Sequence, residues 1–146
     1  MNNQSQIMII CIFSAIVGGI IGILGLIPPL LGWAFLAFML FTAPFILIYF
    51  KKIGIIKNID VKNWTIIGAI AGGASAIGFC IAYIPCALVL NFFFKITSYI
   101  WAKAVFLNFF SVILFPILIA LTSAMFNAFS GYITATFINM FYRNDK

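Results

Sequence analysis

The sequence predicts an all-α polytopic membrane protein, in which four transmembrane helices form two hairpins. Three observations lead to this fold class. Hydrophobic residues make up 66% of the chain and charged residues only 7%, whereas a soluble domain carries about 25% charged residues. Apolar runs recur that reach the roughly 20 residues a helix needs to cross a bilayer. The few charged residues lie between or beyond those runs, so residues 1–146 are expected to form a single membrane domain.

The first two apolar runs predict a tight helical hairpin. Residues 7–27 and 30–50 are each of spanning length, and only the pair Pro28-Pro29 separates them. Proline disfavours helical geometry in the residue before it but is accepted in the first turn of a helix, so this pair ends one helix and begins the next. Within the second run, Pro44 predicts a bend.

A third helix is expected over residues 64–90, within the long apolar stretch Trp64–Phe94. At 1.5 Å per residue the whole stretch is about 46 Å long, against a hydrocarbon core of about 30 Å. The helix must therefore tilt, bend or leave the bilayer before its end, and Pro85 is the expected point of bending. The preceding residues 51–63 hold four lysines and one acid, and we expect them to form the loop between the two hairpins.

The last apolar stretch predicts a fourth helix over residues 104–128, bent at Pro116. A helical extension over residues 129–142 is then expected to leave the bilayer or lie on its surface. An alternative gives five helices, because two short helices would also fit if the chain turned near Thr122-Ser123 or Ser130-Gly131. No charge or proline marks such a turn, so we prefer the four-helix topology.

The basic residues predict the orientation of the chain in the cell membrane. In the four-helix topology one side holds Lys51, Lys52, Lys57, Lys62, Arg143 and Lys146, and the other holds only Lys95 and Lys103. Segments rich in Lys and Arg stay on the cytoplasmic side of a membrane. Both termini and the loop at residues 51–63 are therefore expected in the cytoplasm.

Two short sequence echoes raise the question of an internal duplication. Residues 15–19 and 69–73 differ at one position, and Pro44–Ile48 resembles Pro116–Ile119. Together they suggest a parallel two-plus-two repeat of hairpins, an arrangement that many transporter folds use. The competing interpretation is coincidence, since Gly is frequent in membrane helices. The sequence leaves both open.

Small residues at helical spacing predict where the helices pack. Gly18 and Gly22 form one such face, and Gly68, Gly72 and Ala76 form another. Small residues let two helix backbones approach closely in lipid, where dispersion and weak hydrogen bonds drive association. We expect these two faces to contact each other. A self-association surface and a permeation path are the competing interpretations.

Polar residues of the last apolar stretch fall within an arc of about 160° on a helix. They are Asn108, Ser111, Thr122, Ser123, Asn127, Ser130 and Thr134. Polar groups inside a membrane tend to face protein or water. Interhelical hydrogen bonding is the preferred interpretation, and a polar-lined path or a docking face for a partner are the alternatives.

The residue types that catalysis requires are scarce in this chain. It contains no His, and Asp60 and Asp145 are its only acidic residues. Cys11, Cys80 and Cys86 lie within apolar runs and lack the spacing of metal ligands. We therefore expect no enzymatic activity, cofactor or metal. The lysines form no basic stripe, which argues for contact with lipid headgroups rather than with nucleic acid.

These observations predict a small multi-pass protein whose partner is the lipid bilayer. Small-residue faces without ionisable chemistry favour an accessory or assembly subunit, which self-associates or binds a larger membrane partner. The alternative is passive permeation or movement of lipids and other amphiphiles, as in a flippase or a holin, along the polar residues of the last helix.

Overall fold

The computed structural model describes residues 3–27, 41–54, 60–94 and 109–143. In these residues the backbone forms α-helices and no strands, which confirms the prediction of an all-helical chain for this part. The helices are α1 (Asn3–Leu24), α3 (Thr42–Lys52), α4 (Val61–Phe94) and α6 (Phe109–Arg143).

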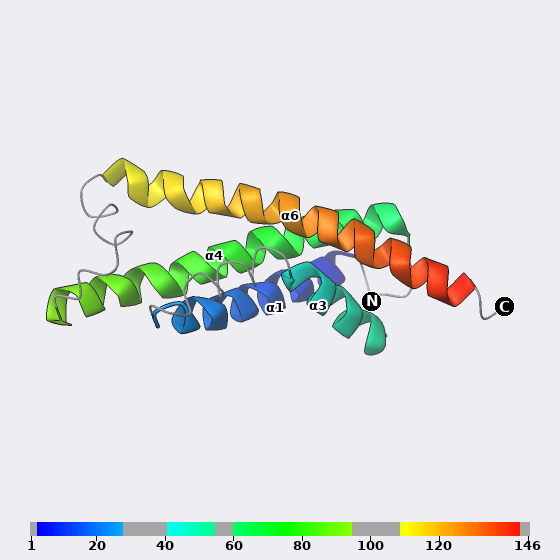
Figure 1. Ribbon diagram of the computed structural model, residues 1–146, viewed down its shortest axis with the longest axis horizontal. Helices are drawn as coiled ribbons and strands as arrows, with labels where there is room; N and C mark the ends of the chain where they lie inside the picture. Colours follow the sequence, from blue (N-terminus) through cyan, green and yellow to red (C-terminus); the bar gives the residue numbers. More distant parts are fainter. Residues whose placement is uncertain (1–2, 28–40, 55–59, 95–108, 144–146) are drawn as a thin grey trace.

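The long helices α1, α4 and α6 lie side by side, with α4 between the other two in Figure 1. α1 and α4 run in the same direction, because Gly18 lies against Ser75 and Gly22 lies against Phe79, four residues further along both helices. α6 runs in the opposite direction (Figure 1). The central helix therefore has a neighbour on two sides over much of its length.

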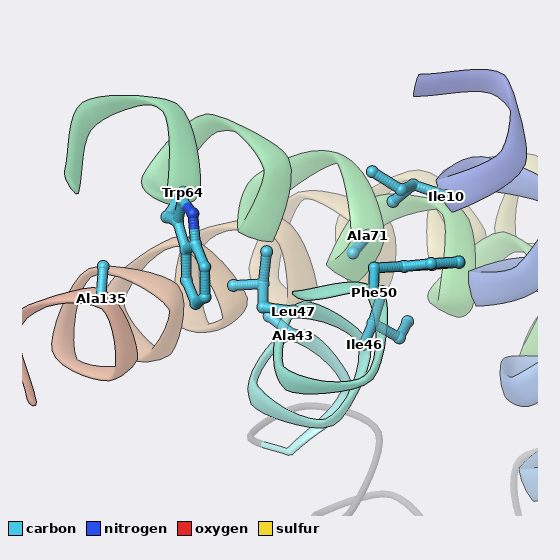
Figure 2. Packing of buried hydrophobic residues seen from close by; sticks show 8 residues of the cluster. All are labelled: Ile10, Ala43, Ile46, Leu47, Phe50, Trp64, Ala71 and Ala135. Carbon is cyan, nitrogen blue, oxygen red and sulfur yellow. The ribbon is translucent and has the colours of Figure 1, made fainter. Parts of the chain in front are cut away.

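The short helix α3 packs against one half of this layer. Its buried face consists of Ala43, Ile46, Leu47 and Phe50. Figure 2 shows Trp64 and Ala71 of α4 beside these side chains, with Ile10 of α1 near Ala71 and Ala135 of α6 on the far side of Trp64, all in one cluster. One apolar cluster thus contains residues from all four described helices.

Successive helices alternate in direction along the chain. The first residues of α1 and α4 and the last residues of α3 and α6 lie at the same end of the bundle (Figure 1). Lys51, Lys52 and Lys62 are at or next to these helix ends, and we call this end of the molecule the basic end. The alternation is compatible with two consecutive hairpins.

Three of the described helices are long and apolar enough to cross a membrane. The spans are Ser5–Leu24 in α1, Val61–Leu90 in α4 and Pro116–Met140 in α6. The described part of the expected second span is α3, whose 11 residues are fewer than the roughly 20 that a crossing needs. Residues 30–40 of that span lie outside the described residues.

The outer faces of the long helices consist of large apolar side chains, as a lipid-facing surface requires. On α1 the exposed side chains include Ile9, Ile12, Ile16, Ile20 and Ile23, and on α6 they include Leu114, Leu118, Leu121, Met125 and Phe129. A soluble protein of this size rarely exposes so much contiguous apolar surface. The exposed faces therefore agree with insertion into a membrane.

The structure corrects two expectations about helix ends. α3 begins at Thr42, so Pro44 lies in the first turn of a helix and does not bend the middle of one; a first-turn proline loses no hydrogen bond within the helix. The five-helix alternative is wrong at both proposed turns, because α6 continues unbroken through Ser123 and Gly131 to Arg143. α4 likewise continues through Pro85.

Candidate functional site

The first candidate feature is the contact between α1 and α4, where the two backbones touch. A Cβ atom at Gly18 would overlap the carbonyl oxygen of Ser75, and a Cβ atom at Gly78 would overlap the carbonyl oxygen of Ala15. A Cβ atom at Gly22 would lie only 2.8 Å from the carbonyl oxygen of Phe79. Such proximity lets glycine Cα–H groups face carbonyl oxygens across the interface, as weak hydrogen bonds of membrane helices do.

The contact between α4 and α6 has the same form. A Cβ atom at Gly68 would overlap the carbonyl oxygen of Asn127, and one at Gly131 would lie 2.9 Å from the carbonyl oxygen of Trp64. Gly72 is as close, since its Cβ atom would be 2.6 Å from the carbonyl oxygen of Ser123. The two interfaces share one arrangement. A glycine of each helix lies against a backbone carbonyl of the other helix, and that carbonyl belongs to the residue three or four positions before the other helix's own glycine.

This geometry corrects the predicted pairing of the small-residue faces. Gly18 and Gly22 do lie against α4, but Gly68 and Gly72 face α6 instead of α1. Ala76 is fully buried in an apolar cluster that also contains Phe79, Cys80, Tyr83, Ala87 and Ile119. The expected contact between the two glycine faces therefore does not form.

The sequence-based predictions did not include Gly78 and Gly131. Gly78 is the partner of Gly18 in the contact between α1 and α4, and Gly131 is the partner of Gly68 in the contact between α4 and α6. Both stand in rows of small or polar residues at helical spacing. The row on α4 is Ala71, Ser75, Gly78 and Ala82, and the row on α6 is Ser123, Asn127, Gly131 and Ala135. These rows are the signal that could have identified them, because side chains three and four residues apart lie on one helix face.

Asn127 is the centre of a buried polar group at the meeting point of α3, α4 and α6. Its side chain is fully buried. The Oδ1 atom accepts a hydrogen bond of 2.7 Å from the backbone N–H of Ala43, and the Nδ2 atom donates to the carbonyl oxygen of Ser123 at 3.0 Å. Both ends of the amide are thus satisfied inside the bundle, as buried polar groups require.

The same group reaches α4 through a backbone carbonyl. The carbonyl oxygen of Gly72 accepts a bond from the hydroxyl of Ser123 at 2.9 Å and another from the hydroxyl of Ser75 at 2.9 Å. The bond from Ser123 to Gly72 forms where α4 and α6 approach closely, because Gly72 has no side chain to keep them apart. The close packing and the hydrogen bonds therefore depend on the same residues.

Three other hydroxyls of the predicted polar stripe form hydrogen bonds within α6 and not with another helix. The hydroxyls of Thr122, Ser130 and Thr134 donate to carbonyls of their own helix, three or four residues earlier. Such local bonds satisfy a hydroxyl in lipid without a partner helix. Asn108 lies outside the described residues, as does the side chain of Ser111. The described stripe thus forms no continuous polar lining.

Asn127 also caps α3 from a distance. The residue at the N-cap position, Phe41, provides no side-chain cap, so the first-turn N–H of Ala43 depends on a residue 84 positions away. The next residue, Pro44, has no N–H to satisfy. An uncapped N–H facing lipid would cost several kcal/mol, which explains the need for a buried amide there.

Within the described residues the charged groups lie at the basic end and away from the buried polar group. Burial lowers the pKa of Lys51 below its ordinary value. Among the described residues no three His, Cys, Asp or Glu side chains gather closely enough to hold a metal ion. The arrangement can hold helices together at close range, and it offers interior amide and hydroxyl groups.

A comparison of the chain with models of known protein families, with curated proteins and with solved structures finds no match.

The glycine contacts predict a sharp difference between two adjacent substitutions. Gly18→Ala places a methyl group where the carbonyl of Ser75 lies, so α1 must move away from α4; we expect a loss of about 2 kcal/mol or more of stability, as for overpacked cores. Gly19→Ala meets its nearest atom at 3.7 Å and should be neutral or stabilising, because alanine favours helix. Thermal denaturation of both variants in detergent measures the difference. Equal melting temperatures would contradict the backbone contact at Gly18.

Proposed function

We propose that this chain is an integral protein of the cell membrane that crosses the bilayer four times. Its first three spans are residues 7–27, 30–50 and 64–90, and its fourth is Pro116–Met140 of α6 in place of the expected residues 104–128. α1 runs away from the basic end and α4 starts from it, so the chain has to return between them. α3 runs in that returning direction. The return of the chain supports a fourth crossing, for which the 11 residues of α3 are too few by themselves.

The basic end is proposed to face the cytoplasm, together with both termini and residues 51–63. The support is that Lys51, Lys52 and Lys62 belong to the end where α1 begins and α6 finishes. Positively charged segments are retained on the cytoplasmic side.

The orientation can be tested with two single-cysteine variants in a background without Cys11, Cys80 and Cys86. Lys52→Cys lies at the basic end, and Phe93→Cys is exposed near the other end of α4. In intact cells a membrane-impermeant maleimide should label the Phe93→Cys variant, and label the Lys52→Cys variant only after permeabilisation. The opposite pattern would reverse the orientation, and labelling of both variants in intact cells would argue against insertion.

We also propose an internal two-plus-two repeat, in which the second pair of helices follows the first in the same order and the same directions. α1 and α4 run in parallel, as the repeat requires, and so do α3 and α6, since Ala43 pairs with Asn127 and Leu47 lies beside Gly131. The echoed glycines differ in their contacts, however. Gly18 lies against α4, whereas its counterpart Gly72 lies against α6.

The function that the geometry supports best is that of a non-catalytic accessory or assembly subunit, which binds a larger membrane protein or a second copy of itself. The observation that carries this proposal is that the glycine faces are used inside the chain, whereas the outer faces of α1 and α6 remain exposed. The closest glycine contacts are made within the chain, while the outer faces of α1 and α6 are mostly apolar and carry no Asp, Glu, His or Lys among the described residues. Such faces suit lipid or another apolar helix.

Site-specific photo-cross-linking in native membranes tests the accessory role. A photoreactive amino acid replaces the exposed Ile16 of α1 or the exposed Met125 of α6, and Lys52 at the basic end provides the control position. Protein adducts at one of the two apolar faces, in excess of those at the control, support a subunit role. Adducts with lipid alone at both faces would rule it out.

A second candidate function is the passage of lipids or other amphiphiles. The observation in its favour is the buried polar group of Asn127 and Ser123, which places amide and hydroxyl groups inside an otherwise apolar bundle. A polar headgroup crossing the bilayer needs such partners, because unsatisfied polar groups in lipid are costly.

Liposomes that contain fluorescent phospholipids test this second function. Purified protein should accelerate the movement of lipid between leaflets, and Asn127→Leu should reduce that rate while Thr122→Val, whose hydroxyl bonds within its own helix, should not. Movement at the rate of protein-free liposomes would exclude the activity for the lipids tested.

A further inference from the structure

The exposed face of α3 carries a row of two aromatic side chains and one cation. Phe45, Tyr49 and Lys52 fall within an arc of about 60° on the helix, and the row is about 10 Å long along the helix axis. Phe45 is 58% exposed and Tyr49 41%, and Lys52 is exposed as well. Since α3 finishes at the basic end (Figure 1), this aromatic–lysine row changes from apolar to charged toward that end.

Aromatic contacts hold the ring of Tyr49 in place between α1 and α3. The ring lies nearly parallel to that of Phe13 of α1, with centroids 5.4 Å apart and planes 7° apart. It is also nearly parallel to the ring of Phe45, at 6.5 Å and 5°. Both distances are in the range of favourable ring pairs. Phe13 further contacts the buried Phe50 edge-on, so the exposed stack is attached to the apolar core.

The polar groups of the aromatic–lysine row are available to a ligand. Among the described residues, neither the hydroxyl of Tyr49 nor the ammonium of Lys52 has a hydrogen-bond or ion-pair partner. The adjacent Lys51 differs, because its Nζ atom is buried. Asp60 is the only acidic residue in the described part of the chain, and it accepts a hydrogen bond from the backbone N–H of Lys62. No carboxylate of this part therefore neutralises Lys52.

The order of these groups along α3 matches the order of groups in a phospholipid. A lysine extends its ammonium to the headgroup region, tyrosine prefers the interface, and phenylalanine is suited to hydrocarbon. Lys52 and the hydroxyl of Tyr49 are donors for phosphate oxygens, while Phe45 and the exposed Ile48 offer an apolar surface for an acyl chain. Basic sites between membrane helices bind anionic headgroups. An acidic protein segment would match Lys52 alone and leave the apolar half of the row to lipid.

We propose that the aromatic–lysine row is a binding site for one anionic phospholipid of the leaflet at the basic end. The lipid phosphate binds the ammonium of Lys52 and the hydroxyl of Tyr49, and an acyl chain lies along Phe45. The site differs from a general attraction of lysines to an anionic surface, because the stacked ring fixes the position of the hydroxyl beside one particular lysine. The proposal rests on the membrane insertion proposed above and on neither of the two candidate activities.

Native mass spectrometry of the purified protein, titrated in detergent with phosphatidylglycerol or phosphatidylcholine, tests the site. The wild-type protein should bind the first phosphatidylglycerol more tightly than phosphatidylcholine. Lys52→Gln should weaken phosphatidylglycerol binding about fivefold and remove this preference, since one lysine near an anionic surface contributes about 1 kcal/mol. Tyr49→Phe keeps the stacked ring and should weaken the binding of both lipids about threefold, because both contain the phosphate that the hydroxyl binds. Lys52→Arg should retain the preference.

Lys62→Gln is the matched control, because Lys62 is also exposed at the basic end but lies on α4, outside the row. It removes the same charge and should leave the preference for phosphatidylglycerol intact. An equal loss in Lys62→Gln and Lys52→Gln would show attraction by net charge and overturn the site, as would equal binding of the two lipids by the wild-type protein. Extraction of the protein from native membranes by alkaline carbonate would instead indicate failure of insertion, which this separate measurement distinguishes from failure of the site.

Discussion

Direct backbone contact at glycine residues is the constraint on which the rest of this structure depends. In lipid no hydrophobic effect drives one apolar helix onto another, so association depends on dispersion and weak hydrogen bonds at short range. α4 achieves that range twice, against α1 through Gly18 and Gly78 and against α6 through Gly68 and Gly131. Because a methyl group at Gly18 or Gly78 would overlap a carbonyl, the position of each helix follows from the location of its glycines.

The buried hydrogen bonds follow from this close approach. Only where α4 and α6 touch can the hydroxyl of Ser123 reach the carbonyl oxygen of Gly72, and the same approach holds Asn127 where it meets Ala43 of α3. The short helix is therefore positioned by a side chain that the packing of two other helices has already oriented. The apolar side chains Ile46, Leu47 and Phe50 complete the attachment of α3 to the bundle.

The sequence alone supported the helical class, the small-residue faces and the preference for interhelical hydrogen bonds in the last helix. It was right that Gly18 and Gly22 lie against α4, but it failed on the partner of Gly68 and Gly72, which lie against α6. At 100° per residue Gly68, Gly72, Ser75 and Phe79 fall within an arc of about 60° on α4, so they form one row on one face. Periodicity reveals such a row but not that its first half meets α6 and its second half meets α1. The start of α3 was missed for a similar reason, since its cap is provided by Asn127 and no local residue signals it.

Composition and the length of the apolar runs by themselves determined that the chain is helical and suited to a membrane, because unsatisfied backbone groups are excluded from lipid and a helix satisfies them within one segment. The positions of the lysines gave the expected topology one side that carries most of the basic residues. Tertiary structure alone decided which faces pair, which polar groups are buried and where α3 begins. Those outcomes depend on contacts such as the hydrogen bonds between residues 51 and 84 positions apart, and such contacts are set by the crossing of whole helices, which local sequence does not encode.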